Sequence, residues 1–427
     1  MRRTAALILA AVLLLTGCSR IQREEGTIGV ITAEPSQTEQ EARTSEPDTE
    51  SESVTETEAP TETETQTETE TETETETETE TETETETETE TETEEEPVDP
   101  AWMAPEGEAY GAASQRYLRY INDTFGWRVN GLGYDPGQKN WTANWLDYKM
   151  KEFGYGEARI TGDVHVDDHD GKSYKVVSYS YRKPGASPKR IVIGAHYDAM
   201  ESHGAEDNGT GLAMTLELAK RFAKMDTPLT LEFCFWDGEE QQGSAGSYYY
   251  IHQTADLKDI VLYINLDCLG AGDKMFVYGG CWEDGTLVRD WGYNYAMALA
   301  KQFGIELNTI PPLAEEQWFK APTRTIGSDQ MYFNDADIPY IYFEANAWVN
   351  EEGVEQYPNG NKAFQYNTAD PRFADTQGQI NHTHHDDLDH LEEMFPGRIE
   401  SHMRQFSKIL TEILLKTDEN TPAAYTR

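Results

Sequence analysis

Apolar runs of strand length alternate with amphipathic segments through most of the chain after residue 100. Apolar or alternating runs predict strands at 172–183, 190–199, 229–240, 259–270 and 338–345. Apolar residues three or four positions apart predict helices at 110–122, 141–153, 208–225, 244–255 and 288–304. Because strands that are apolar throughout are covered on both faces, this order predicts an α/β fold. We expect a mostly parallel, mixed central sheet with helices on both faces.

The start of the chain follows a different pattern. Arg2 and Arg3 precede an apolar stretch from Ala5 to Leu15, which is too short to span a bilayer comfortably. The stretch runs into Leu-Thr-Gly-Cys at residues 15–18, which resembles the lipobox of bacterial lipoproteins. That resemblance implies a signal peptide at 1–17 and a lipid on Cys18, so the protein would be extracellular and anchored to a bacterial cell membrane. The alternative is an ordinary secretory signal with an incidental cysteine.

Residues 55–96 are an almost pure alternation of threonine and glutamate. A period of two is typical of a strand, but here one face would be all glutamate and neither face would be apolar. Repulsion between the glutamates and the lack of an apolar face predict a disordered, extended linker across 18–100. The globular domain is therefore expected at 101–427.

Acidic residues outnumber basic residues in both parts of the chain. Residues 1–100 contain 30 acidic and 5 basic residues, and residues 101–427 contain 49 acidic and 29 basic residues. A surface of this sign repels nucleic acid and anionic lipid headgroups. We therefore expect no nucleic-acid partner, and membrane contact only through the lipid anchor. The sequence leaves the oligomeric state open.

Cysteine is scarce in the expected globular domain, which contains Cys234, Cys268 and Cys281. An odd number permits at most one internal disulfide. Cys234 falls within an apolar strand and is expected to be a buried thiol. A bridge between Cys268 and Cys281 is left open.

Histidine and carboxylate residues recur where the expected strands end. These residues follow three successive strands or lie in the loop after the first of them: His196, Asp198, Asp207, Glu239, Glu240 and Asp267. In open α/β sheets, sites form at the carboxyl ends of the strands, so these side chains are expected to meet. A histidine-rich loop at 380–391, with the sequence INHTHHDDLDHL, follows near the C-terminus.

Each of these residues has a simpler interpretation when it is taken alone. Asp207 could be a helix N-cap, the Gly-Glu-Glu segment could be a solvated turn, and Asp267 could end a strand at a turn. Together they favour a metal site, because three successive strands all end in potential ligands. Histidine with carboxylate and without thiolate suits zinc, with manganese or cobalt as alternatives, and disfavours calcium. Three carboxylates and two histidines are enough for two ions that share one carboxylate.

Five short motifs carry a resemblance to a known family. They are GAHYDA, GAEDNGTG, DGEE, INLD and HTHHDDLDHL, in the order in which that family has them. On these motifs, residues 110–415 resemble the co-catalytic zinc aminopeptidases of the bacterial leucyl-aminopeptidase type, whose relatives include glutamate carboxypeptidase and the glutaminyl cyclases. The resemblance implies the zinc-peptidase (phosphorylase/hydrolase-like) fold for the domain at 101–427.

The resemblance also implies a metal ligand set with zinc as the cofactor, two ions in all. Asp207 would be the carboxylate shared by both ions. His196 and Asp267 would complete one zinc site, and Glu240 and His382 would complete the other.

Two further residues would take part in catalysis. Glu239 resembles the general base of the family, which takes a proton from zinc-activated water and passes it to the leaving amine. Asp198 resembles the aspartate that orients the His196 side of the site. The two adjacent glutamates would therefore have different roles, because Glu240 would bind metal and Glu239 would transfer protons.

The chain departs from the family pattern at several places. Asn381 stands where a tyrosine often precedes the last histidine, and Gln330 stands where the family often has histidine. Alignment on the HTxxD pattern favours His382 as the ligand, and makes the neighbouring His384 and His385 loop residues near the site.

The function expected from these features is a secreted, lipid-anchored metallopeptidase, an aminopeptidase that acts on peptide substrates. One alternative is an enzyme related to the glutaminyl cyclases, with a single zinc ion. Another alternative is a non-catalytic binding module on the same fold, although such a module would be expected to lose ligands or the base.

Overall fold

The computed structural model describes residues 99–129, 137–167, 173–240, 243–254, 256–283, 286–309, 327–349 and 364–426. These residues belong to one compact unit, which extends over Pro97–Arg427. Cys18, the expected signal peptide at 1–17 and almost all of the expected linker at 18–100 lie outside the described residues. Within the described ranges, every helix is too short or too polar to cross a membrane.

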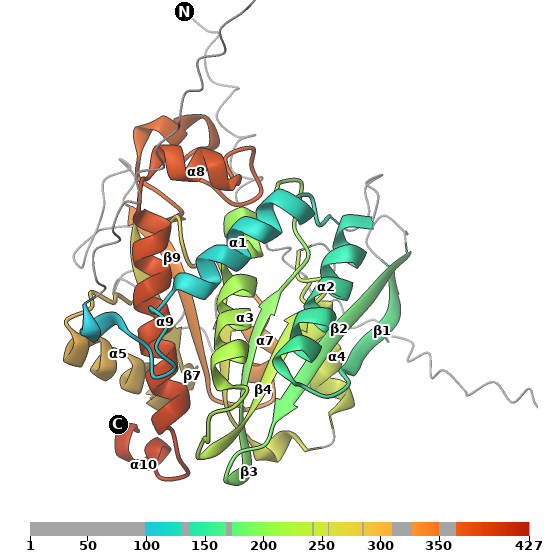
Figure 1. Ribbon diagram of the computed structural model, residues 1–427, viewed down its shortest axis with the longest axis vertical. Helices are drawn as coiled ribbons and strands as arrows, with labels where there is room; N and C mark the ends of the chain where they lie inside the picture. Colours follow the sequence, from blue (N-terminus) through green and yellow to red (C-terminus); the bar gives the residue numbers. More distant parts are fainter. Residues whose placement is uncertain are drawn as a thin grey trace, which may run out of the picture. The chain divides into compact units, whose positions relative to one another are not determined.

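Eight strands of the described residues form one mixed sheet (Figure 1). From one edge the order is β1 (Arg159–Asp167), β2 (Ser173–Lys183), β4 (Leu229–Trp236), β3 (Ser187–His196), β5 (Ile260–Leu266), β9 (Tyr340–Val349) and β10 (Phe364–Tyr366), with β6 (Lys274–Gly279) also paired to β9. The four central strands β4, β3, β5 and β9 are parallel, whereas the outer strands pair antiparallel to them or to each other. A separate hairpin is formed by β7 (Cys281–Glu283) and β8 (Thr286–Val288).

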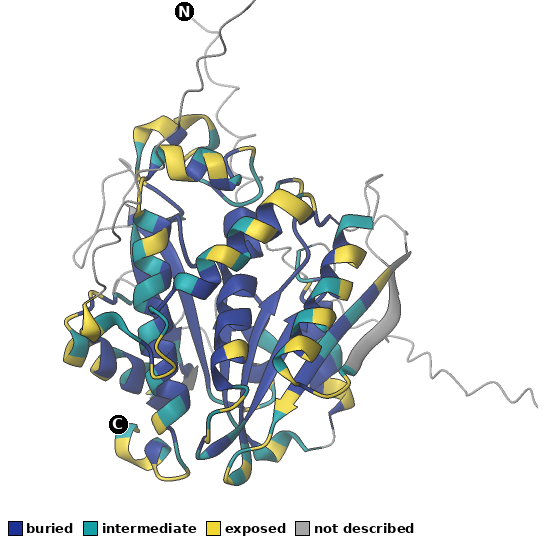
Figure 2. Cartoon of the chain, viewed as in Figure 1, coloured by how far each residue is buried: buried dark blue, intermediate teal, exposed yellow. Residues whose placement is uncertain are grey.

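Alternate residues of each central strand enter two different hydrophobic cores. Ile191, Ile193 and Ala195 of β3 face the larger core, whereas Val192 faces the smaller one. The larger core is covered by α1 (Ala112–Phe125), α2 (Gly137–Phe153), α3 (Gly211–Phe222), α5 (Trp291–Phe303) and α9 (Arg398–Lys416). The smaller core lies under α4 (Ala245–Gln253) and α7 (Gln330–Asp335). Figure 2 shows the result, with buried central strands and α3 inside an exposed outer surface.

The remaining short elements lie in connections and at the chain end. They are η1 (Pro100–Trp102), η2 (Ala205–Thr210), η3 (Leu257–Asp259), η5 (Pro371–Thr376), α8 (Leu388–Met394) and α10 (Thr421–Tyr425). The mixed α/β fold expected from the sequence is confirmed, with the parallel part confined to the four central strands. The sequence pattern did not reveal β1, β6, β10 or α9.

Helix α9 is the largest element that the sequence reading missed. Its buried residues include Ile399, Met403, Phe406 and Leu410, which recur every three or four positions along one face. That face packs into the larger core, where α9 contacts α3 and α5. The periodicity was therefore present in the sequence, but it lies beyond the last of the family motifs.

A buried polar cluster joins α1, α3 and α9. The carboxylate of Glu217 on α3 accepts hydrogen bonds from the backbone N–H groups of Gly111 (3.1 Å) and Ser114 (2.8 Å) at the start of α1. Arg221, one turn further along α3, donates to Glu217 (2.9 Å) and to Thr411 of α9 (2.8 Å). Glu217 thus accepts hydrogen bonds from N–H groups that a helix leaves unpaired at its N-terminus. The positive charge of Arg221 lies against the negative charge of Glu217.

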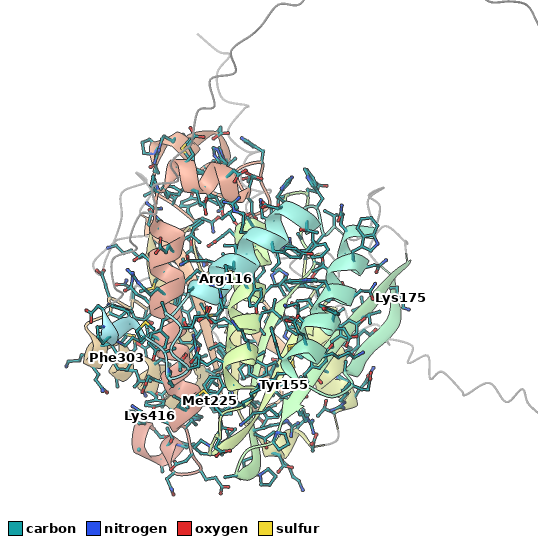
Figure 3. All side chains as sticks on the ribbon, in the orientation of Figure 1. Arg116, Tyr155, Lys175, Met225, Phe303 and Lys416 are labelled. Atoms are coloured by element: carbon teal, nitrogen blue, oxygen red, sulfur yellow. The ribbon has the colours of Figure 1, made fainter. Side chains whose placement is uncertain are left out.

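Helix α2 is joined to α3 through Tyr155, two residues beyond its end. Tyr155 is buried, and its hydroxyl donates a 2.9 Å hydrogen bond to the carbonyl oxygen of Ala219 in α3 (Figure 3). The ring packs edge-on against Phe233 of β4, with ring centroids 5.8 Å apart. Tyr155 therefore fixes α2 both to a neighbouring helix and to the sheet.

We predict that Leu410→Ala lowers the free energy of unfolding by about 2–5 kcal/mol, because it leaves a cavity at a fully buried position of α9. The matched control is Lys416→Ala, at an exposed position of the same helix (Figure 3), which should change the free energy by about 0.5 kcal/mol or less. Urea unfolding followed by circular dichroism measures both variants. Equal losses in the two variants would show that α9 is not part of the core.

Candidate metal centre

The carboxyl ends of three parallel strands meet at one edge of the sheet. His196 is the last residue of β3, and Asp267 directly follows β5. Glu239 and Glu240 follow β4 after a short turn. Since β4, β3 and β5 are neighbours in the sheet, these side chains converge as the sequence predicted.

Asp207 lies between two histidines and faces each with a different oxygen. Its Oδ1 lies 3.1 Å from His196 Nε2, and its Oδ2 lies 3.1 Å from His382 Nε2. Asp267 Oδ1 is 3.3 Å from the same nitrogen of His196, and Glu240 Oε2 is 2.8 Å from that of His382. The five donors therefore form two groups of three that share Asp207. Donor atoms of His196, Asp207 and Glu240 all lie within 4.8 Å of one another, so the two groups are adjacent.

The histidine-rich loop contributes one residue to this cluster. His382, with φ of 59°, turns its ring toward Asp207 and Glu240, while 31% of its side chain stays exposed. His384 and His385 instead contact Asp375, away from the five donors. The structure therefore brings together all five residues expected as ligands, and it separates His382 from its histidine neighbours.

Asp198 holds the turn that carries the tandem glutamates. Its two carboxylate oxygens accept hydrogen bonds from the backbone N–H groups of Glu239 (3.2 Å) and Glu240 (3.3 Å). The carbonyl oxygen of Asp198 also lies 3.1 Å from His196 Nδ1. A proton on Nδ1 would donate to that oxygen, which leaves Nε2 with a lone pair directed at Asp207 and Asp267. Asp198 thus orients both the histidine and the glutamate pair.

Glu239 lies beside the donors without taking a place among them. Its Oε1 accepts a 3.2 Å hydrogen bond from the hydroxyl of Ser244, which precedes α4. Burial raises the pKa of the Glu239 carboxyl well above its ordinary value, and the charges of Glu240 and Asp329 raise it further, against the opposing charge of His196. Glu239 is therefore placed to accept a proton at the edge of the donor cluster.

The donor set fits zinc. Oε1 of Glu240 is buried and has no hydrogen-bond partner among the described residues, although a buried carboxylate oxygen normally has one. Burial, followed by the charge of Asp207, raises the pKa of Glu240 to about 7 against the lowering effect of His382. A bound cation would satisfy the orphaned oxygen and offset the repulsion between carboxylates. Histidine nitrogen and carboxylate oxygen are ligands that zinc accepts.

Three buried residues that the sequence reading did not single out support the loop with Asp207. Asp386 accepts hydrogen bonds from the backbone N–H groups of Glu206 (2.6 Å) and Asp207 (3.2 Å). Glu206 in turn accepts from the N–H of Gly270, with 2.9 and 3.0 Å to its two oxygens. Arg128 donates to three carbonyl oxygens between Tyr197 and Gly204. Asp386 is the last residue of the HTxxD pattern and Glu206 lies in the GAEDNGTG motif, whereas Arg128 lies outside the five motifs.

Asp267 is held by a chain of hydrogen bonds that runs through Ser328 and Asn265 to Gln330. Ser328 donates to Asp267 Oδ2 (2.9 Å), and Asn265 donates to Ser328 (3.0 Å) and to Gln330 (2.9 Å). Gln330, which replaces a histidine of the family pattern, is fully buried in this chain of contacts. Glutamine at position 330 therefore bears on the hydrogen bonds that hold Asp267 in place. Asn381, the other departure, donates its backbone N–H to Asn367 (3.2 Å).

All three cysteines of the domain are buried thiols outside any disulfide. The bridge between Cys268 and Cys281 that the sequence left open is therefore not formed. The thiol of Cys268 lies 3.4 Å from Asp267 Oδ1, and burial raises its pKa well above the ordinary value. Cys268 is accordingly a neutral thiol that donates to Asp267.

Comparison with known proteins places the chain in a family. The sequence profile of Peptidase family M28 matches residues 177–407, more than half of the chain and the whole segment that contains the cluster. The alkaline phosphatase isozyme conversion protein of Escherichia coli (strain K12) is 26% identical over 309 residues, which cover 66% of this chain and 79% of that protein. An aminopeptidase of Pseudomonas aeruginosa (strain UCBPP-PA14) is 35% identical over 118 residues, 26% of this chain and only 21% of that protein.

The fold is also found among solved structures. A glutaminyl cyclase of Bacteroides thetaiotaomicron, solved with bound N-acetylhistamine, has a TM-score of 0.50 and 18% identity, and the match covers 72% of this chain and 98% of that one. The α/β fold, the histidine and carboxylate donors and the profile match together define the class, which is that of the zinc metallopeptidases. The chain belongs to Peptidase family M28. The resemblance inferred from the five motifs is thereby confirmed at the level of the family.

We predict that Glu240→Ala lowers the zinc content of the purified protein by about one equivalent per chain, because it removes one donor and leaves His382 without its nearest carboxylate. Glu239→Gln serves as the matched control, since the neighbouring side chain lies outside the two donor groups. Elemental analysis after dialysis measures both variants. An unchanged zinc content in Glu240→Ala would remove Glu240 from the ligand set.

Proposed function

We propose that the protein is an aminopeptidase that removes N-terminal residues from peptides with two zinc ions at the shared Asp207. The observation that carries this proposal is the carboxylate of Asp207, whose two oxygens each face a different histidine at 3.1 Å. Two donor groups joined by one carboxylate are what a pair of ions about 3.5–4 Å apart requires. The aminopeptidase relative from Pseudomonas aeruginosa supports the same activity.

In this proposal His196, Asp207 and Asp267 would hold one zinc ion, and His382, Asp207 and Glu240 would hold the other. Zinc bound there would supply Lewis-acid chemistry, which polarises a peptide carbonyl and makes water acidic near neutral pH. Glu239 takes a proton from the attacking water onto its carboxylate and gives it to the nitrogen of the leaving amine. Asp198 keeps Glu239 and Glu240 in place through their backbone N–H groups. Ser244 orients the Glu239 carboxylate for this transfer.

We further propose that the protein acts outside the cell, attached to the membrane through a lipid on Cys18. The apolar stretch from Ala5 to Leu15 and the lipobox-like residues 15–18 support this location. The acidic linker at 18–100 would hold the catalytic domain away from the membrane surface, to which it would be connected only by the anchor. Its substrates would then be extracellular peptides.

The activity is tested by a product assay on the full-length protein. Peptides with free, acetylated and glutaminyl N-termini are incubated with and without chelator, and the products are identified by mass spectrometry. We expect loss of one residue from the free N-terminus, no reaction of the acetylated peptide, and no product after metal removal. Loss of ammonia from the glutaminyl peptide without cleavage would instead identify a glutaminyl cyclase. Absence of any product would favour the non-catalytic binding module.

The role of Glu239 is tested by Glu239→Gln, which keeps the shape of the side chain but removes its basicity. We expect kcat to fall by roughly 10²–10⁴-fold, the usual contribution of a general base. Zinc content should stay at the wild-type level, because Glu239 lies outside the donor groups. Turnover at the wild-type rate would exclude Glu239 as the base.

A further inference from the structure

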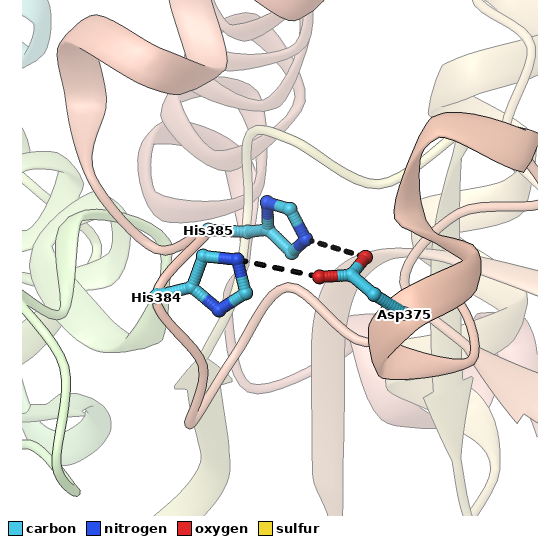
Figure 4. A group of neighbouring side chains, drawn as sticks. All are labelled: Asp375, His384 and His385. Atoms are coloured by element: carbon cyan, nitrogen blue, oxygen red, sulfur yellow. Dashed lines mark hydrogen bonds and ion pairs between the residues drawn. The ribbon is translucent and has the colours of Figure 1, made fainter.

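A second group of histidine and carboxylate side chains comes from the C-terminal part of the sequence (Figure 4). Asp375, in η5, faces the rings of His384 and His385, which belong to the loop after His382. Asp375 Oδ1 lies 3.0 Å from His385 Nε2, and Asp375 Oδ2 lies 3.3 Å from His384 Nε2. The donor atoms of all three residues lie within 4.8 Å of one another.

We propose that Asp375, His384 and His385 form a third metal site, which binds a zinc-type divalent ion independently of the catalytic centre. Two imidazole nitrogens and one carboxylate are a donor set that zinc accepts, with water in the fourth position. Ligands arranged tetrahedrally around zinc at about 2.0–2.2 Å are separated by roughly 3.3 Å. The separations of 3.0 Å from His385 to Oδ1 and 3.3 Å from His384 to Oδ2 of Asp375 are close to that value, and an ion with water in the fourth position would use one of these two oxygens.

The two histidines play different parts in this site. His385 has 8% of its side chain exposed, and its ring packs against Phe373 with centroids 4.4 Å apart. His384 has 70% of its side chain exposed, and its ring lies 4.1 Å from that of His385 between centroids. One ligand is therefore held rigidly by packing, and the other lies at the surface, where an ion can enter.

His390 is a hydrogen-bond partner of the buried ligand. Its Nε2 lies 2.9 Å from His385 Nδ1, so one of these two nitrogens must carry a proton. When Nε2 of His385 binds an ion shared with Asp375, the proton of His385 lies on Nδ1 and is donated to His390. A metal-binding histidine normally donates its other ring N–H to such a partner. His390 therefore supplies the acceptor that this site requires.

Metal binding at Asp375, His384 and His385 would restrict the movement of the loop that carries His382. His384 and His385 follow His382 closely, and Asp386 binds the backbone of Glu206 and Asp207. An ion shared with Asp375 would tie this loop to η5 and so restrict the position of His382. The two sites nevertheless share no donor atom, because His382 faces Asp207 and Glu240, whereas His384 and His385 face Asp375.

The test is the number of zinc equivalents that the full-length protein binds after chelator treatment, measured by titration calorimetry. His384→Gln and Asp375→Asn should each bind one equivalent fewer than the wild type. His252→Gln, which replaces another exposed histidine, is the matched control and should bind as the wild type does. Glu240→Ala, altered only in the catalytic centre, should retain the equivalent that His384→Gln loses. Wild-type stoichiometry in both His384→Gln and Asp375→Asn would overturn the proposal.

The part assigned to His390 has its own test. His390→Leu should weaken zinc binding at this site by roughly 10–100-fold, the usual effect of removing the partner of a metal-binding histidine. Circular dichroism confirms that the variant is folded. Unchanged affinity in the folded variant would show that His390 does not orient His385.

Discussion

Repulsion between five carboxylates at one edge of the sheet is the constraint on which the arrangement of the surrounding loops depends. Asp198, Asp207, Glu239, Glu240 and Asp267 lie within a small, largely buried volume. Two like charges 4 Å apart near a protein surface repel by about 4 kcal/mol at an effective dielectric constant of about 20. Such a group keeps its position only where donors and cations surround it. The pKa of Glu240 is raised first by burial and then by this repulsion, through the charge of Asp207.

The fold meets the constraint mainly with backbone N–H groups. Asp198 binds the turn after β4, Asp386 binds the backbone of Glu206 and Asp207, and Glu206 binds the segment after β5. Each carboxylate thus fixes a loop that belongs to a different strand. Arg128 adds a buried positive charge behind them. The loops consequently form one hydrogen-bonded network. Displacement of one carboxylate would therefore alter the hydrogen bonds that position the neighbouring carboxylates.

The sequence predicted those parts of the structure that depend on local pattern. The central strands are apolar throughout because both faces are covered, and the donors follow them directly, so His196, Asp267 and the tandem glutamates could be placed. Arg128 could not, because its partners are backbone carbonyl groups that come near it only through tertiary folding. The HTxxD pattern distinguished His382 from the neighbouring histidines, but the positive φ of its backbone carried no signal in the sequence.

The contact between Glu206 and Asp386 joins residues 180 positions apart in the chain. Contacts of this range form only after a long loop has closed, which makes them slow to form during folding. Synthesis proceeds from the N-terminus, so the tandem glutamates leave the ribosome well before the histidine-rich loop does. A chain still being synthesised therefore carries only part of the donor cluster. The donor cluster is thus completed late in synthesis, after the strands that carry most of its residues are already made.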